Sequence, residues 1–266
     1  MAIAPFLAMT AAELHSLSAL SFPIAWMACH FSPYGTALSN LPKDLPPGSV
    51  LILDDITPPR GHDPVQIAEQ LKACVEEFQC SAVLLDFQRT GCEETRSIAR
   101  HLTAVLPCPT VVSEGYAGEL ACPVFLSPVP PSSQPELYFS PWKGREVWLE
   151  LGLSGELLTL TERGCNAAAF PCPDPEAKGF SDQELCCHYT MDVSETAVRF
   201  TLWRNREDTV RLLAEAEKLG IVGAVGLYQE FASQGLQEVL FQKPTYAKTA
   251  LDQLQSGLEQ YSRGTY

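Results

Sequence analysis

The chain has 266 residues, of which 46% are hydrophobic and 19% are charged, and its formal net charge is −14. This composition supplies enough apolar side chains for a large core and excludes a mostly disordered chain. The acidic balance argues against nucleic acid and anionic membranes as partners and favours a neutral or cationic one.

The first segment along the chain, Met1–Met9, is apolar. No Lys or Arg precedes it, and it is shorter than the apolar core of a secretory signal. No other apolar stretch approaches the length of a membrane span. We therefore expect a cytoplasmic protein that contacts no membrane.

Short apolar runs alternate with helix-like segments through most of the chain, which is the pattern of a parallel sheet with helical crossovers. Several runs are continuously hydrophobic, as expected for strands that are buried on both faces. Eight runs in a chain of this length predict one α/β domain over residues 1–266, folded as a closed (β/α)8 TIM-like barrel. An open doubly wound sheet is the alternative. The predicted strands are Pro23–Ala28, Val50–Leu53, Ala82–Leu85, Thr110–Val112, Pro123–Leu126, Glu146–Leu149, Val198–Leu202 and Val222–Leu227.

Four helices are predicted between and after these strands. Asp63 and the proline after it mark the start of the first, because aspartate caps a helix and proline fits its first turn. Glu93–Val105 follows the third predicted strand. Asn205 caps a further helix, which Gly220 ends. The last helix covers about Tyr246–Tyr261 and is expected to pack outside the barrel.

The segment Gly152–Ser194 does not fit this alternation and predicts an irregular insertion before the seventh predicted strand. Glu156–Thr161 within it has the character of a strand. Tyr189–Val193 is expected to pair with Val198–Leu202 through a turn at residues 194 and 195.

Polar and aromatic side chains follow almost every predicted strand. Because the working residues of a (β/α)8 barrel lie just past the C-terminal ends of its strands, these side chains are expected to meet on one rim. Carboxyl pairs can divide acid and nucleophile roles, so carboxylates ringed by aromatic side chains favour a carbohydrate site. The catalytic candidates are Asp86, Glu114, Glu150 and Glu230. The candidates for substrate binding are His30, Tyr34, Asp54, Gln88, Tyr116, Trp203 and Tyr228. The alternative is an ordinary solvated rim, since the strands of any soluble barrel end in polar loops.

Two pairs of neighbouring polar residues refine this prediction. Asp54 and Asp55 are adjacent in a strand, so we expect only one of them to face the pocket. Asp86 and Gln88 are two residues apart and therefore share a face.

The motifs of several enzyme classes are absent from the sequence. It has no Gly-rich phosphate loop, no Gly-x-Ser-x-Gly and no His-Glu-x-x-His, which argues against nucleotide, serine hydrolase and zinc protease chemistry. None of the ten cysteines forms a Cys-x-x-Cys pair, and several lie in apolar runs, so we expect reduced, buried thiols. The group Cys165, Cys172, Cys186, Cys187 and His188 matches no standard zinc spacing. We expect neither a metal nor another cofactor.

Two segments resemble the chitinase-type glycoside hydrolases of family eighteen and their non-catalytic relatives. The first is Ser81–Gln88, which lies where that family has a strand reading Asp-x-x-Asp-x-Asp-x-Glu. The second is Phe200–Glu230, where a strand, a capped helix and a glycine-rich strand ending at Tyr228 are similar to the family's closing strand. In the family, an aromatic residue at that point floors the sugar site. The resemblance implies a barrel of that superfamily.

The resemblance also implies roles for individual residues. Asp86 matches the aspartate that orients the acetamido group of the substrate. Gln88 stands where the family has its proton-donating glutamate, and an amide cannot act as a general acid. Ser81 and Leu84 replace the first two acidic positions. The segment also falls on the third predicted strand, whereas the family carries it on the fourth.

These observations leave three hypotheses for the function. We favour a glycoside-hydrolase-like barrel that binds a carbohydrate or glycan fragment at the C-terminal face of its strands, without the family's usual catalysis. The alternatives are an active glycosidase that uses a pair of the carboxylates, and a protein-interaction scaffold without a small ligand. A cleft with a carboxyl pair supports hydrolysis, whereas a filled rim supports the scaffold.

Overall fold

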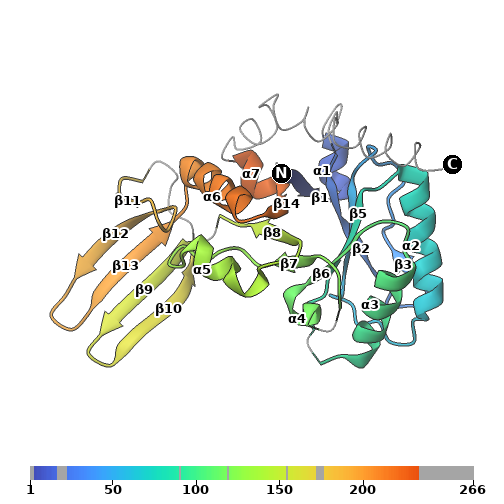
Figure 1. Cartoon of the computed structure of the whole chain (residues 1–266), viewed down its shortest axis with the longest axis horizontal. Helices are drawn as coiled ribbons and strands as arrows, with labels where there is room; N and C mark the ends of the chain where they lie inside the picture. Colours follow the sequence, from blue (N-terminus) through green and yellow to red (C-terminus); the bar gives the residue numbers. More distant parts are fainter. Residues whose placement is uncertain are drawn as a thin grey trace.

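Eight parallel strands close into a barrel in the computed structural model, which describes residues 3–16, 23–89, 91–118, 120–153, 155–171 and 177–233. Each strand pairs with the next along the chain, and the first and last strands pair with each other. This confirms the predicted (β/α)8 TIM-like fold (Figure 1). The barrel strands are β1 (Ala4–Met9), β2 (Ala25–Phe31), β4 (Val50–Asp54), β5 (Ala82–Asp86), β6 (Thr110–Ser113), β7 (Val124–Leu126), β8 (Val147–Leu151) and β14 (Ile221–Leu227). The short β3 (Leu38–Ser39) pairs antiparallel with the end of β2.

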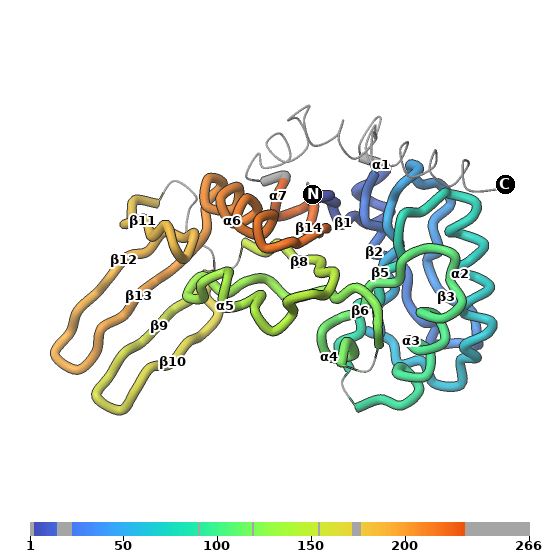
Figure 2. Tube along the Cα trace, viewed as in Figure 1, coloured from blue at the N-terminus to red at the C-terminus, as the bar shows by residue number. Residues whose placement is uncertain are grey.

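The membership of the barrel differs from the prediction in two strands. The apolar run Ala4–Met9 forms β1, which pairs with both β14 and β2 and closes the barrel (Figure 2). The predicted strand Val198–Leu202 is not part of the barrel, because it pairs antiparallel with two strands of a second sheet. The count of eight was therefore right, but one member was wrong. As a result, Ala82–Asp86 is the fourth barrel strand, which is where the family resemblance expects its acidic motif.

The barrel interior is filled by alternate side chains of these strands. Phe6 of β1 stacks on Trp148 of β8 with ring centroids 5.4 Å apart, and Ile52 and Leu84 are buried beside them. A Cβ on Gly223 of β14 would lie 2.5 Å from the Trp148 ring, so the glycine makes room for the indole. The opposite faces of the strands form a larger outer core with the surrounding helices. The interior is thus packed, and a cavity can open only at an end of the barrel.

The helices that accompany the barrel strands are unequal in length. The long ones are α2 (Pro64–Phe78), α3 (Glu93–Val105) and α6 (Arg206–Lys218), and the short ones are α1 (Ala11–Ser16), α4 (Glu114–Ala117), α5 (Pro135–Phe139), η1 (Ser140–Trp142) and α7 (Tyr228–Ser233). The predicted caps are confirmed: the carboxylate of Asp63 accepts a hydrogen bond from the amide of Val65, and Asn205 forms a capping box with Asp208. The predicted helix at 246–261 lies outside the described residues. No described helix combines the length and apolar character of a membrane span.

The chain between β8 and α6 forms a separate five-stranded antiparallel sheet, which we call the insert sheet (residues 155–203). It consists of β9 (Gly155–Thr161), β10 (Gly164–Phe170), β11 (Phe180–Asp182), β12 (Cys187–Val193) and β13 (Val198–Trp203), in the order β10-β9-β13-β12-β11. The expected hairpin between β12 and β13 is confirmed, with a turn in which the amide of Ser194 donates to the carbonyl of Ala197. The insertion therefore precedes the eighth barrel strand, not the seventh, and it extends through Trp203. It projects from the side of the barrel (Figure 1).

A buried arginine ties the base of the insert sheet to the barrel. Arg204 follows β13, is 4% exposed, and donates hydrogen bonds to carbonyls of the insert segment and of the loop after β7. These acceptors are the carbonyls of Cys186, Leu185, Val129 and Pro130. A single guanidinium, which presents five donors in a fixed geometry, therefore satisfies two carbonyls of the loop and two of the insert segment.

Candidate functional site

A cavity of about 450 Å³ opens at the C-terminal ends of the barrel strands. Its floor consists of apolar side chains from six strands, and its rim consists of polar and charged ones. The floor is lined by Ala8, Met27, Ile52, Leu84, Phe125, Val225 and Leu227. The rim carries His30, Asp54, Asp55, Asp86, Gln88, Arg89 and Glu150. An apolar pocket with a few convergent polar groups is the usual form of a small-molecule site.

The strand register brings the acidic side chains of the rim together. His30, Asp54 and Asp86 are direct cross-strand partners on β2, β4 and β5. Asp54 lies two residues after Ile52, and Asp86 lies two residues after Leu84. Ile52 and Leu84 point into the barrel interior. Because side chains alternate along a strand, the two carboxylates also point toward the barrel axis. Glu150 follows Trp148 on β8 by the same spacing. The rim is therefore the last interior layer of the barrel, with charged residues in place of apolar ones.

Asp86 and Gln88 form the closest polar contact in this cavity. The side-chain amide of Gln88 donates to Oδ1 of Asp86 at 2.5 Å. The backbone amides of Gln88 and Arg89 both donate to the carboxylate of Asp55, at 2.8 and 3.0 Å. The loop after β5 is thus held in place from β4, and Gln88 is fixed with its amide against Asp86.

Asp54 and Asp55 both line the cavity, which differs from the expectation that only one of them would face it. Their roles are nevertheless distinct. The carboxylate of Asp55 is occupied by the two loop amides, whereas that of Asp54 accepts from the amide of Ile56 at 3.1 Å and lies 3.4 Å from Nδ1 of His30. The His30 distance suits an ion pair when the imidazole is protonated, but its alignment falls short of a hydrogen bond. The other ring nitrogen of His30 contacts the side-chain amide of Asn40 at 2.9 Å.

Burial shifts the proton affinity of the three inward carboxyls in the same direction. It raises the pKa of both Asp54 and Asp86, although the amide of Gln88 opposes the shift at Asp86. Burial, followed by the charges of Asp86 and Glu230, raises the pKa of Glu150 to about 7. A carboxyl with that value carries a proton in about half of the molecules at neutral pH, so it can donate as well as accept hydrogen bonds.

A second, smaller cavity of about 130 Å³ adjoins the first. The two share Gln88, Phe125 and Glu150, and the smaller one adds Glu114 with Ser113 and Ser127. Phe125 therefore borders both spaces. The arrangement extends the site along the rim from β5 toward β7 and β8.

Solved structures share this architecture, whereas no family model and no curated protein sequence matches the chain. A chitinase-like agglutinin from Robinia pseudoacacia matches with a TM-score of 0.55 at 10% identity, over 90% of this chain and 100% of that one. A mutant chitinase of family eighteen from Cycas revoluta, in complex with (GlcNAc)4, matches with a TM-score of 0.54 at 9% identity, over 89% and 97%. The spore cortex-lytic enzyme SleL of Bacillus cereus matches with a TM-score of 0.51 at 10% identity, over 85% and 70%. The chain has the fold of the family-eighteen chitinases.

The chitinase-like barrel brings together most of the residues that the sequence nominated. Among the catalytic candidates, Asp86 and Glu150 line the main cavity and Glu114 lines the smaller one. Glu230 lies on α7, lines neither cavity, and accepts a hydrogen bond from the amide of Leu153 at 3.1 Å. Among the binding candidates, His30, Asp54 and Gln88 line the main cavity.

Four aromatic candidates lie outside both cavities of the chitinase-like barrel. Trp203 is buried in the insert sheet, 6.1 Å from the ring of His188, so its expected place on the barrel rim was wrong. The side chain of Tyr34 is 89% exposed. Tyr116 is buried, and its hydroxyl donates to the carbonyl of Arg89. Tyr228 begins α7 and packs against the outer core, so it does not floor the site.

Sequence reasoning did not nominate Asp55, Arg89 or Phe125 as site residues. Arg89 donates from its guanidinium to the carbonyls of Asp55 and Ile56, which places it over the rim. Phe125 is the central residue of the three-residue strand β7 and has apolar neighbours on both sides. A search for polar residues after each strand cannot find it. The alternation of β7 could have done so, since one of its three residues must face the barrel interior.

The described residues contain no group of three or more His, Cys, Asp or Glu side chains arranged to hold a metal ion. The nine cysteines in the same part of the chain are free thiols, and several of them are buried. The cavity itself carries carboxyls, a side-chain amide, an imidazole, a guanidinium and an aromatic ring.

Proposed function

We propose that the cavity binds a carbohydrate or glycan fragment and that the chain lacks the acid–base catalysis of the family-eighteen enzymes. The observation that carries the proposal is the contact between Asp86, which ends the fourth barrel strand, and Gln88 in the loop after it. By the family resemblance, Gln88 occupies the place of the proton-donating glutamate. An amide side chain has no proton to release, so the step that protonates a leaving glycoside oxygen has no donor at this position.

The composition of the cavity supports a neutral, hydroxyl-rich ligand. Asp54 and Asp86 offer acceptors, Arg89 and Gln88 offer donors, and Phe125 offers a ring at the junction of the two spaces. Two of the similar folds are consistent with this ligand class, since one is a chitinase mutant in complex with (GlcNAc)4 and another is an agglutinin. The net charge of −14 disfavours an anionic ligand.

An open cavity of about 450 Å³ argues against the scaffold hypothesis, which requires a filled rim. It falls in the range of roughly 300–1,000 Å³ that is usual for ligand pockets. We therefore place the binding site in this cavity.

The test is binding to a glycan array that includes chito-oligosaccharides, followed by titration calorimetry with the best ligand. We expect Asp86→Ala to weaken binding by roughly 10- to 100-fold, since a buried hydrogen-bonding carboxylate is worth about 1.5–3 kcal/mol. Glu69→Ala is the matched control, because Glu69 is an exposed carboxylate on α2 that lines neither cavity. Absence of any ligand on the array would refute the proposal, and so would equal losses in the two variants.

A second candidate function is hydrolysis with Glu150 as the acid. The observation in its favour is that Glu150 faces the same cavity as Asp86 and has a pKa of about 7, which suits a general acid at neutral pH. Release of reducing ends from a bound oligosaccharide by the wild-type chain would support it. In that case Glu150→Gln should abolish turnover and retain binding. If the wild-type chain binds the oligosaccharide without cleaving it, this candidate is excluded.

A further inference from the structure

The insert sheet has one apolar face and one polar face. Residues that lie directly opposite each other on antiparallel strands share a face, so the register sorts the side chains into rows. Three rows on one face are almost entirely apolar. They are Cys165–Leu160–Val198–Val193, Ala167–Leu158–Phe200–Met191 and Ala169–Glu156–Leu202–Tyr189–Phe180. We call these residues the apolar face. Its one charged member, Glu156, accepts from the amide of Ser132 at the barrel end of the sheet.

The opposite face has the composition of a surface in water. Midway along the sheet six of its eight side chains are polar, in the rows Asn166–Thr159–Arg199–Asp192 and Ala168–Leu157–Thr201–Thr190. An antiparallel sheet with one apolar and one polar face normally packs its apolar face on another layer. The sequence of the insert thus specifies a buried face.

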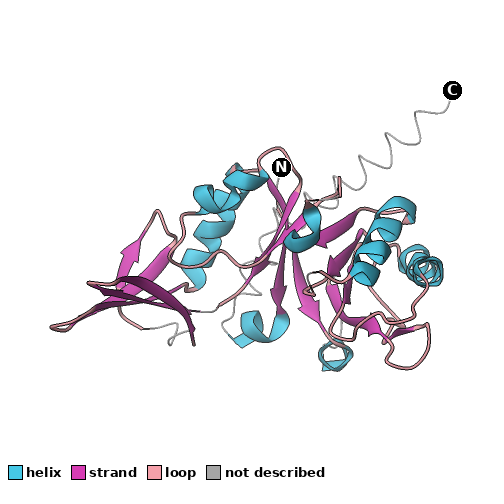
Figure 3. Cartoon of the chain, turned by 90° about the horizontal axis from the view of Figure 1, so that it is seen from below, coloured by secondary structure: helices cyan, strands magenta, loops and turns pink. Residues whose placement is uncertain are grey.

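That layer is missing among the described residues. Within the described part of the chain no helix stacks on the insert sheet, which stands as a single layer beside the barrel (Figure 3). Phe180 is 65% exposed, Val193 63% and Met191 53%. The rings of Phe180, Tyr189 and Phe200 lie in a row across three strands, with centroids 5.5 and 6.0 Å apart. Contiguous exposed apolar surface of this kind marks an interaction site.

We propose that the apolar face binds the same face of a second copy of this chain, so that two insert sheets form a β-sandwich. A face of four strands, about 4.8 Å apart and roughly 23 Å long, offers roughly 450 Å² of flat area before the corrugation of its side chains is counted. With the side chains included, this approaches the roughly 600–800 Å² per partner of a stable interface. A two-fold symmetric dimer needs only one such patch, which meets its own copy.

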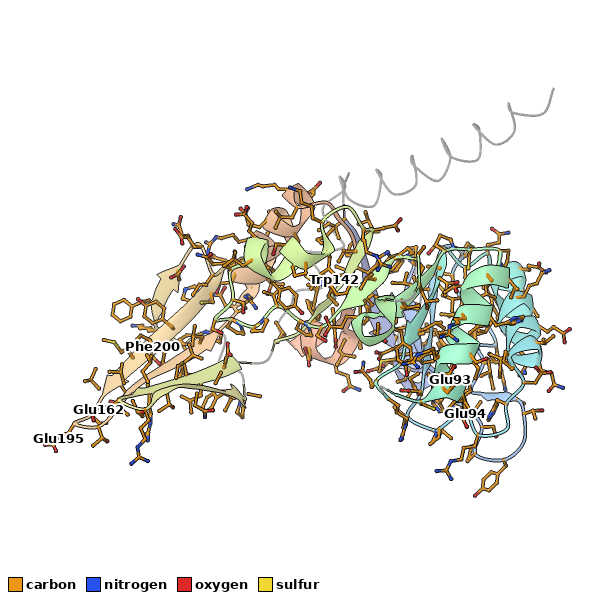
Figure 4. All side chains as sticks on the ribbon, turned by 60° about the horizontal axis from the view of Figure 1, so that its bottom comes forward. Glu93, Glu94, Trp142, Glu162, Glu195 and Phe200 are labelled. Carbon is orange, nitrogen blue, oxygen red and sulfur yellow. The ribbon has the colours of Figure 1, made fainter. Side chains whose placement is uncertain are left out.

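The absence of charge on most of this face suits a second copy as its occupant, and the charges elsewhere set the orientation of that copy. The only charged residue of the apolar face is Glu156, which lies at the barrel end of the sheet. Stacking two copies of the face therefore buries no unpaired charge along the rest of the sheet. Glu162 and Glu195 lie at the tips of the two long hairpins, with Phe200 midway along the sheet (Figure 4). We expect the two sheets to stack antiparallel, so that the hairpin tips of the two copies lie at opposite ends of the sandwich. This keeps the tip carboxylates of the two copies apart. It also separates the two barrels, which repel each other because each chain has a net charge of −14.

Sedimentation velocity of the full chain, over a dilution series from roughly 1 μM to 1 mM, tests the proposal. We expect a dimer that dissociates on dilution. Met191→Glu should weaken the dimer at least about 100-fold, because each two-fold interface receives two buried like charges. The matched control is Thr190→Glu. It adds the same charge at the residue before Met191 on β12, where the side chain lies on the polar face. It should change the dissociation constant by less than about three-fold.

Several outcomes would overturn the proposal. A wild-type chain that stays monomeric throughout the series would do so, as would equal effects of the two substitutions. Binding of the wild type to neutral phospholipid vesicles or to insoluble polysaccharide, lost in Met191→Glu, would assign the face to another occupant. Met191 is largely exposed, so its substitution leaves the sheet folded, and an unchanged circular dichroism spectrum and melting temperature verify this.

Discussion

The eight barrel strands bury both of their faces, whereas the five strands of the insert sheet are buried mainly at their barrel end and leave much of both faces exposed. In the barrel, one set of alternate side chains packs in the interior around Trp148 and Phe6, and the other set packs against the helices. In the insert sheet, large side chains such as Leu160 and Met191 remain 41% and 53% exposed. A closed sheet supplies its own second layer, and an open one does not.

This difference shows that the structures of the two regions depend on different interactions. The rim carboxylates are positioned by the strand register of a barrel that is complete within one chain. The insert sheet depends on its attachment at Arg204 and, by our proposal, on a second chain.

The largest effect is expected at the attachment point. Arg204→Ala removes every hydrogen bond of the guanidinium and leaves the carbonyls of Cys186, Leu185 and Pro130 without their donor. Since each buried unsatisfied group costs about 1–3 kcal/mol, the free energy of unfolding should fall by roughly 3–5 kcal/mol. Denaturant unfolding followed by tryptophan fluorescence measures it, because Trp203 is adjacent.

Arg199→Ala provides the control for this change. Arg199 is an exposed arginine of β13, in the insert sheet itself, and its loss should change the free energy of unfolding by less than about 0.5 kcal/mol. Similar effects of the two substitutions would show that Arg204 is not the attachment point. A single cooperative transition in Arg204→Ala with little loss of stability would lead to the same conclusion.

The same contrast explains how far the sequence alone could lead. Seven of the eight barrel strands are continuous apolar runs with polar residues after them, and this pattern located Asp54, Asp86 and Glu150 correctly on the cavity. The position of these residues at the ends of the runs carried the inference, because the C-terminal ends of the strands form the working rim of such a barrel. The pattern could not identify Phe125, which has no polar marker.

The two errors in strand membership have a physical reason as well. Ala4–Met9 is a short apolar run near the start of the chain with no turn signal before it, so its role as β1 depends on pairing with β14, almost the whole barrel away in sequence. Val198–Trp203 alternates apolar with polar residues, which is typical of an antiparallel strand with one solvent-exposed face. Barrel strands that are buried on both faces read as continuous apolar runs, so the alternation in Val198–Trp203 could have distinguished this segment from them.

A matched pair of leucines should reveal the different burial of the two regions. Leu84→Ala empties a position that is 0% exposed in the barrel interior, and should reduce the free energy of unfolding by about 2–5 kcal/mol. Leu160→Ala, on the apolar face, should cost less than about 1 kcal/mol in the monomer, because the side chain is 41% exposed.

The concentration dependence of Leu160→Ala sharpens this comparison. In a dimer the same side chain is buried, so its loss should cost more at high protein concentration than at low. Chemical unfolding of both variants at two protein concentrations measures the difference. A cost for Leu160→Ala that is the same at both concentrations would contradict the dimer, and a small cost for Leu84→Ala would contradict the packed barrel interior.

The smallest effect concerns the carboxyl of Glu150 and depends on pH. Its pKa in the folded chain, about 7, lies above the ordinary value of 4.5, so between these values the folded state binds more protons than the unfolded state. Stability therefore falls as the pH rises through this window, and the charged carboxylate is least favourable above pH 7. Asp54 and Asp86 shift in the same direction and add to the slope.

Glu150→Gln should remove the contribution of Glu150 to this slope. The amide stays neutral, so the variant should match the wild type near pH 4.5 and exceed it by about 1–3 kcal/mol at pH 8. Unfolding free energies at a series of pH values measure the gap. Glu69→Gln, on the exposed face of α2, should show no such gap. If the two variants behave alike, Glu150 is not buried among like charges at the rim. Its pKa would then not be raised toward 7, and it would not suit the role of a proton donor in the cavity.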